Sequence, residues 1–156
     1  MKIAIALSTA LFLFSASAAL AADAAVDAMV KDFTAAFNKG DMKTVKAMHV
    51  ASPTIIDEMG PHFWSGTSAF DQWAADLGKW ESGQGITGGM PALGKPTRVE
   101  VSGDHAYVVM PSSYSFEQKG QKMRERAQMT LTLAKETGAW KIASWTWTGQ
   151  VAKPVK

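Results

Sequence analysis

One stretch of this chain, residues 54–77, constrains its fold more than any other. It begins with a short apolar run that ends in Asp57, and the dipeptide Gly60–Pro61 then predicts a tight turn. The next residues, which include His62 and Trp64, read as extended chain and lead into a capped amphipathic helix. A strand, a turn and a helix in this order require the chain to fold back on itself. They also bring an acid, a titratable ring and an indole close together.

The part of the chain before this stretch has helical periodicity. Apolar side chains recur at helical spacing and predict a helix over residues 24–38, which Gly40 ends. Asp41 is expected to cap a shorter second helix, and Pro53 is expected to close it. Residues 54–58 then form a short strand.

A third helix is predicted from Thr67 or Ser68 to about Trp80, because apolar residues keep helical spacing there. Residues 82–94 are rich in glycine and are expected to form a mobile surface loop. Beyond them the apolar period changes from about 3.6 residues to about two, which is typical of strands. Helices first and strands afterwards predict an α+β fold, with N-terminal helices packed on an antiparallel sheet. The strands are expected over residues 97–102, 105–116, 122–133 and 139–148.

Four motifs resemble those of the nuclear transport factor two-like superfamily, which includes SnoaL-like polyketide cyclases and ketosteroid isomerases. They are Phe37–Asp41, Phe63–Ser68, Arg124-x-Arg126-x-Gln-x-Thr130 and the ending Gly138–Thr148. The resemblance covers nearly all of the chain after residue 21. It implies a single SnoaL-like domain over residues 22–156, shaped as a cystatin-like cone in which a curved antiparallel sheet wraps around the helices. A pocket is then expected at the open end of the cone.

The resemblance implies that the segment with Asp57 and His62 lies near this pocket. Asp57 can act as a general base if apolar neighbours raise its pKa, and His62 is the candidate partner acid. Tyr107 or Tyr114 can donate a hydrogen bond to a developing oxyanion. Thr146 stands where many SnoaL-like sequences carry a histidine, and this difference counts against proton transfer.

The same region also fits ligand binding without chemistry. Phe63, Trp64 and Trp73, together with Tyr107 and Tyr114, offer the apolar and aromatic lining that small-molecule pockets have. We therefore expect a domain that binds a small, mainly apolar ligand in its cone, or a dimeric accessory protein. An isomerase, cyclase or dehydratase that uses the acid and the histidine is the alternative.

The last predicted strand carries large side chains on both faces if its residues alternate strictly. Trp145 and Trp147 then share one face, and Trp140 and Ile142 share the other. One face packs on the helices, and exposed paired tryptophans on the other normally mark a contact surface. We expect a homodimer formed through the convex face of the sheet. A platform for a carbohydrate or an apolar ligand is the alternative.

The first residues predict a secretory signal peptide. Lys2 gives a positive start, an apolar run follows, and Ala19–Ala21 provides an Ala-x-Ala cleavage pattern. Residues 1–21 are therefore expected to be removed, and the mature chain is expected to be periplasmic or secreted.

Composition excludes several classes of function. The chain has no cysteine, so it forms no disulfide and offers no thiolate. Without residues 1–21 it has 15 basic and 14 acidic residues, which gives no electrostatic case for nucleic acid or an anionic membrane. Residues 83–88 match a GxGxxG pattern but follow a predicted helix, so we expect no dinucleotide cofactor. The three histidines lie far apart, and no metal is expected.

Overall fold

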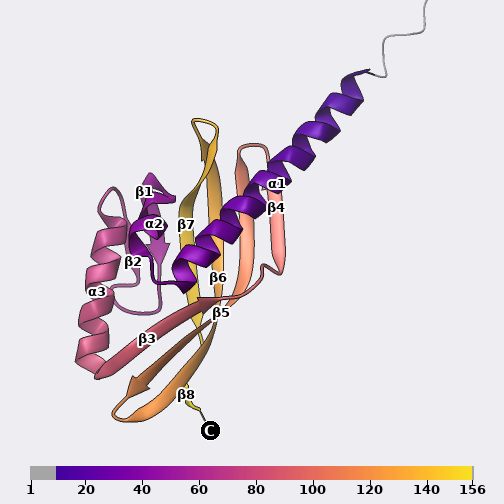
Figure 1. The fold of residues 1–156 in the computed structure, drawn as a ribbon. Helices are drawn as coiled ribbons and strands as arrows, with labels where there is room; N and C mark the ends of the chain where they lie inside the picture. The colour runs from indigo at the N-terminus through magenta and orange to yellow at the C-terminus, as the bar shows by residue number, and fades with distance from the viewer. Residues whose placement is uncertain (1–9, 156) are drawn as a thin grey trace, which may run out of the picture.

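Three helices pack on an eight-stranded sheet in the computed structural model, which describes residues 10–155 and their side chains from residue 24 (Figure 1). The helices are α1 (Ala10–Asn38), α2 (Met42–Ala47) and α3 (Ala69–Gln84). The strands are β1 (His49–Ile56), β2 (Phe63–Ser65), β3 (Ile86–Leu93), β4 (Arg98–Ser102), β5 (His105–Gln118), β6 (Gln121–Glu136), β7 (Ala139–Gly149) and β8 (Lys153–Pro154). Their hydrogen-bonded order is β2-β1-β7-β6-β5-β3, with β4 paired to β5 and β8 paired to β6.

This arrangement confirms the predicted α+β fold, with the N-terminal helices on a curved sheet. The long strands β5, β6 and β7 form the expected antiparallel meander. The sheet as a whole is mixed, because β1 runs parallel to β7. A parallel pair requires a long connection, and the chain between β1 and β7 contains α3 and five other strands.

The predicted signal peptide overlaps the start of α1. Its residues 1–9 lie outside the described residues, and its residues 10–21 belong to the helix. From residue 24 on, α1 buries Val26, Val30 and Phe33 on one side, as the predicted apolar stripe requires. No helix in the described part of the chain has the length and hydrophobicity needed to cross a membrane.

Pro53 does not end the second helix, as the sequence suggested. α2 already ends at Ala47, and β1 begins at His49 and runs through Pro53. The pairing of β1 with β7 is irregular between His49 and Thr54. A proline, which has no backbone N–H, is tolerated in a strand at such an irregularity. Its carbonyl oxygen still accepts a hydrogen bond from the backbone N–H of Gly66 at 3.2 Å.

The predicted surface loop over residues 82–94 is wrong as well. α3 continues to Gln84, and Gly85 ends it in the left-handed conformation with φ of 66°. Strand β3 follows and pairs antiparallel with β5, with a register shift between Thr87 and Met90. The glycines therefore mark a bulged edge strand rather than a loop. This strand forms one side of the cavity described below.

A bulge in β7 changes the predicted faces of that strand. Ala143 is an extra residue between two successive pairs of the β6–β7 ladder. One extra residue shifts the alternation of all the side chains that follow it. Trp145 and Trp147 therefore lie on the same side as Trp140 and Ile142, and all four are buried. The two tryptophans do not form the exposed pair on which the expected homodimer contact depended.

The hydrophobic core lies between α1 and the concave face of the sheet. Phe33 from the helix belongs to the same buried apolar cluster as side chains of β5, β6 and β7. The alternation of β5 and β6 places one apolar side chain out of every two on this face. The fully buried strand residues are Ile55, Val108, Met110, Met129, Leu131, Leu133 and Ile142.

Candidate functional site

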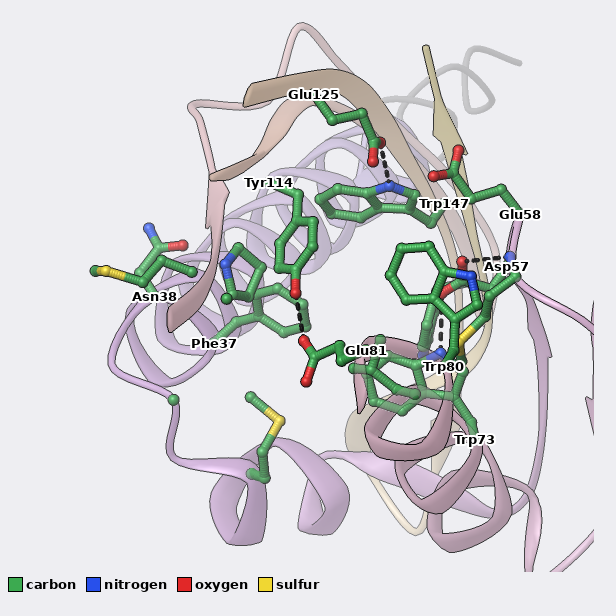
Figure 2. A pocket seen from close by; sticks show the side chains of 18 of the residues that line it. Phe37, Asn38, Asp57, Glu58, Trp73, Trp80, Glu81, Tyr114, Glu125 and Trp147 are labelled. Carbon is green, nitrogen blue, oxygen red and sulfur yellow. Dashed lines mark hydrogen bonds between the residues drawn. The ribbon is translucent and has the colours of Figure 1, made fainter. Parts of the chain in front are cut away.

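A cavity of about 400 Å³ opens at one end of the sheet, between the end of α1, the helix α3 and the concave face (Figure 2). Its walls are mostly apolar and include four indole rings. Such a volume and such walls are those of a small-molecule pocket. The residues that line it are Phe37, Asn38, Lys39, Gly40, Met42, Asp57, Glu58, Met59, Trp73, Leu77, Trp80, Glu81, Gly89, Met90, Pro91, Tyr114, Glu125, Trp145 and Trp147.

Helical spacing on α3 and the bulge in β7 build the aromatic walls. Trp73, Leu77 and Trp80 follow one another at intervals of four and three residues, so they share one face of α3. Trp145 and Trp147 face them from the sheet. The rings of Trp73 and Trp145 meet edge to face, with centroids 4.9 Å apart and planes at 89°. This geometry favours the contact of two indoles.

Asp57 lies directly after β1 and turns its carboxyl group into the cavity. Its Oδ2 accepts a hydrogen bond from Nε1 of Trp73 at 2.9 Å, and its Oδ1 lies 3.4 Å from the backbone nitrogen of Met59. Burial raises the pKa of Asp57 above its ordinary value, although the bond from Trp73 opposes this shift. Asp57 is thus a carboxylate with raised basicity and defined donors.

Glu125 projects from β6 into the same cavity and is only 4% exposed. Its Oε1 accepts a hydrogen bond from Nε1 of Trp147 at 2.8 Å. Burial, and then the neighbouring carboxyl groups of Glu58 and Asp57, raise the pKa of Glu125 to about 8. Glu125 therefore holds its proton at neutral pH. The adjacent Gly149 leaves space for the carboxyl groups of Glu58 and Glu125, because a Cβ at this position would overlap oxygens of both.

Tyr114 and Glu81 form a third polar group in the cavity. The hydroxyl of Tyr114, on β5, donates a hydrogen bond to Oε1 of Glu81, on α3. Burial and the adjacent Glu81 carboxylate raise the pKa of Tyr114, so this hydroxyl keeps its proton. Gly89 of β3 allows the approach, because a Cβ at that position would overlap the hydroxyl. The hydrogen bond between these two side chains links α3 to β5.

The structure brings three of the seven predicted site residues into this cavity: Asp57, Trp73 and Tyr114. Two others lie on the surface. Phe63 is 59% exposed on β2. Tyr107 is 37% exposed on β5, with the guanidinium of Arg98 5.3 Å from its ring centre.

His62 and Trp64 also lie away from the cavity lining. His62 is exposed in the turn before β2, with φ of 75°, and its Nδ1 lies 3.3 Å from the carbonyl oxygen of Asp57 rather than near the carboxyl group. Trp64 is buried in the core, and its Nε1 donates to Oδ2 of Asp76 at 3.0 Å. The predicted pair of Asp57 and His62 is therefore not a pair inside the cavity.

Sequence reasoning missed two acids that matter most here. Glu125 lies on the apolar face of β6, in line with Met123, Ala127 and Met129, and such an interruption is a signal that a sequence can give. Glu81 falls on the face of α3 that also carries Trp73, one turn beyond Leu77. Among the described residues, no three histidine, aspartate or glutamate side chains are grouped closely enough to hold a metal ion.

Comparison of the sequence with models of protein families identifies the family of this chain. A family model described as a SnoaL-like domain matches residues 26–147, which is most of the chain. The chain belongs to the SnoaL-like family. The match includes every residue that lines the cavity of this SnoaL-like domain. No curated protein sequence is similar enough to count as a match.

Solved structures with the same fold include proteins described as enzymes. The hexachlorocyclohexane dehydrochlorinase LinA-type3 from Novosphingobium barchaimii LL02 is 16% identical, with a TM-score of 0.67 over 87% of this chain and 91% of that chain. A putative scytalone dehydratase from Novosphingobium aromaticivorans DSM 12444 is 14% identical, with a TM-score of 0.64 over 90% and 92%. A protein of unknown function from Pseudomonas putida KT2440, described as NTF2-like, is 19% identical, with a TM-score of 0.63 over 83% and 87%. At these identities the likeness concerns the fold.

Proposed function

We propose that this SnoaL-like domain binds a small, mainly apolar molecule in the cavity between α3 and the concave sheet. The observation that carries the proposal is an open cavity of about 400 Å³ whose walls hold four tryptophans and several other apolar side chains. Burial of apolar ligand surface against such walls supplies the affinity. The few polar groups inside, from Asp57, Glu81, Tyr114 and Glu125, supply the orientation.

The neutral probe 4-phenylbutan-1-ol tests this proposal by isothermal titration calorimetry. We expect saturable binding with one site per chain and a negative heat-capacity change, because apolar surface is buried. Trp80→Ala removes one wall of the cavity and should weaken binding roughly tenfold, as the loss of an aromatic contact does. Trp140→Phe is the matched control, because Trp140 is buried in the core but does not line the cavity. Absence of binding, or equal loss in both variants, would contradict the proposal.

Proton transfer on the bound molecule is the second candidate function, and two carboxyl groups in the cavity support it. Asp57, held by donors at both oxygens, is the candidate base, and protonated Glu125 is the candidate acid or hydrogen-bond donor. Asp57 takes a proton from a carbon next to a carbonyl group. The electrons of the broken C–H bond form a C=C bond, and the π electrons of the carbonyl group move to its oxygen. Glu125 stabilises that oxygen by donating a hydrogen bond. The related folds described as a dehydrochlorinase and a putative dehydratase agree with chemistry of this kind.

Deuterium exchange tests the second candidate without a known substrate. We expect 4-phenylbutan-2-one in D₂O to exchange its acidic C–H protons faster with the protein than in buffer alone. Asp57→Asn should reduce the acceleration by at least about tenfold, since a positioned base contributes about 10²–10⁴-fold. His62→Asn is the matched control, because His62 does not line the cavity and asparagine tolerates a positive φ. No acceleration by the wild-type protein would remove this candidate and leave binding in place.

A periplasmic or secreted location belongs to the same proposal. Its support is the sequence of residues 1–21, with a basic start, an apolar run and an Ala-x-Ala site. Expression in a bacterial host and N-terminal sequencing of the protein from the periplasmic fraction test it. The expected mature chain begins at Ala22, and an intact N-terminus in the cytoplasmic fraction would contradict it.

A further inference from the structure

Four carboxyl groups and one cation line the cavity. Asp57 and Glu58 come from the segment after β1, Glu81 comes from α3, and Glu125 comes from β6. Lys39, at the exposed end of α1, is the single basic residue of the lining. Figure 2 shows Glu81 and Glu125 reaching into the cavity from different elements. An apolar cavity with this excess of acids has a negative potential that neighbouring apolar walls strengthen.

The walls between these acids include Trp73, Trp80, Trp145 and Trp147. An aromatic ring carries a negative face, and indole attracts a cation more strongly than other side chains do. Carboxylates and indole rings thus both favour a positively charged ligand. The carboxyl groups are not grouped as metal ligands among the described residues, so this combination suits an organic cation with an apolar body.

We propose that the molecule bound in this cavity carries a protonated amine on an apolar body. The inference rests on the proposed function, since it names the class of ligand that the same cavity takes. An ammonium group donates up to three hydrogen bonds. Glu81 keeps a second carboxyl oxygen beyond the one that accepts from Tyr114, and Glu58 is exposed at the cavity mouth. The apolar body of the ligand fills the space between α3 and β7.

Binding of such an amine is coupled to the proton on Glu125. Glu125 keeps this proton because it is buried and because Glu58 and Asp57 are close. The other titratable groups of the lining are Glu81, Tyr114 and Lys39. An ammonium group that enters the cavity offsets this repulsion, so the O–H bond of Glu125 breaks and the proton passes to solvent. Affinity for an amine should therefore rise from about pH 6 to about pH 9, where an alkylamine is still protonated.

Three probes of equal length separate the charge from the apolar body: 4-phenylbutylamine, 4-phenylbutan-1-ol and 4-phenylbutanoate. Calorimetry should show that the amine binds about ten- to a hundredfold more tightly than the alcohol, as a charge-assisted hydrogen bond predicts. The carboxylate should bind most weakly. The ratio of amine to alcohol affinity should grow with pH, and the alcohol alone should show no comparable trend.

Matched variants assign the effect to the cavity. Glu81→Gln and Glu125→Gln should each reduce the preference for the amine, and Glu125→Gln should also remove its rise with pH. Glu117→Gln is the control, because Glu117 is an exposed acid on β5 outside the lining. Far-UV circular dichroism checks that each variant is folded. Should Glu125→Gln fail to fold, Glu81→Gln decides the question, because it leaves the buried pair of Glu125 and Trp147 intact.

The outcomes separate the inference from the function on which it rests. A tighter complex with the amine that depends on Glu81 supports the inference. Equal affinity for amine and alcohol overturns it while the proposal of an apolar binding site stands. Absence of binding for all three probes overturns both. A preference for the amine that survives every cavity variant also overturns it, because the charge would then be recognised elsewhere.

Discussion

Glu125→Gln is the most informative substitution, because one buried carboxyl group links stability to pH. In the folded chain, burial and then the carboxyl groups of Glu58 and Asp57 raise its pKa from 4.5 to about 8. In the unfolded chain the group titrates near its ordinary value. Between these two values the folded state therefore binds the additional proton. The free energy of unfolding must then fall as the pH rises from about 4.5 to about 8, and it stays at the lower level above that range.

The size of the effect follows from the shift. One pKa unit corresponds to about 1.4 kcal/mol, so the whole shift corresponds to at most about 5 kcal/mol. Water in the open cavity screens part of this interaction, and we expect a loss of roughly 2–4 kcal/mol between pH 5 and pH 9. Glutamine cannot ionise, yet its Oε1 can still accept the hydrogen bond that Nε1 of Trp147 donates to Glu125 at 2.8 Å. The variant should match the wild type near pH 5 and exceed it near pH 9.

Urea unfolding followed by circular dichroism at pH 5, 7 and 9 measures this difference. Glu117→Gln, which removes an exposed acid from β5, should retain the pH dependence of the wild-type protein. Asp57 is present in all three proteins, so its own raised pKa contributes equally to each. Parallel curves for wild type and Glu125→Gln would refute the reasoning, since they would show that the buried glutamate carries no shifted proton.

Three further substitutions test the packing and boundaries of the site. Gly89→Ala should destabilise the folded chain by roughly 1–3 kcal/mol in urea unfolding, because a Cβ there overlaps the hydroxyl of Tyr114. Gly83→Ala is the control: this glycine of α3 faces open space, so the substitution should leave the stability unchanged or raise it by up to about 1 kcal/mol. Trp73→Phe removes the indole N–H that donates to Asp57, and an NMR pH titration should show the pKa of the Asp57 carboxyl group rising further. An unchanged or lower pKa would disprove the role of this hydrogen bond. His62→Asn should leave the affinity for 4-phenylbutan-1-ol within about twofold of wild type, and a tenfold loss would return His62 to the site.

The features of the fold that could be predicted are those with local causes. The apolar period of residues 24–38 and the cap at Asp41 depend on neighbouring residues, and both appear as expected, with Oδ1 of Asp41 accepting from the backbone N–H of Thr44 at 3.1 Å. The errors arose at Pro53, at residues 82–94 and at Ala143. In each case the partner strand decides the outcome, since a bulge is a property of a pair of strands. A single strand does not show where its partner will skip a residue.

The candidate site was predictable only in part for the same reason. Asp57 and Trp73 were found because an acid after a strand and an indole on an apolar helix face can be recognised locally. Trp64 was expected beside them, but its indole N–H donates a hydrogen bond to Asp76, and Trp64 does not line the cavity. Prediction of Glu125 as a site residue with a raised pKa would have required knowledge of its neighbours in the fold. An acid among the apolar positions of β6 could have been noted, but the groups that raise its pKa come from a segment almost seventy residues earlier.

Because of the extra residue in β7, the cavity depends more on the number of residues in this strand than on the identity of the residue at position 143. Ala143 is small and half-buried, so many replacements at this position should be tolerated. Its deletion is a different matter, because strict alternation would return and Trp145 and Trp147 would turn to the convex face. The cavity would lose the edge-to-face partner of Trp73 and the hydrogen-bond donor of Glu125 in one step. Among natural relatives, the loss or gain of a single codon in this strand is thus a sharper marker of a conserved cavity than sequence identity at any position within it.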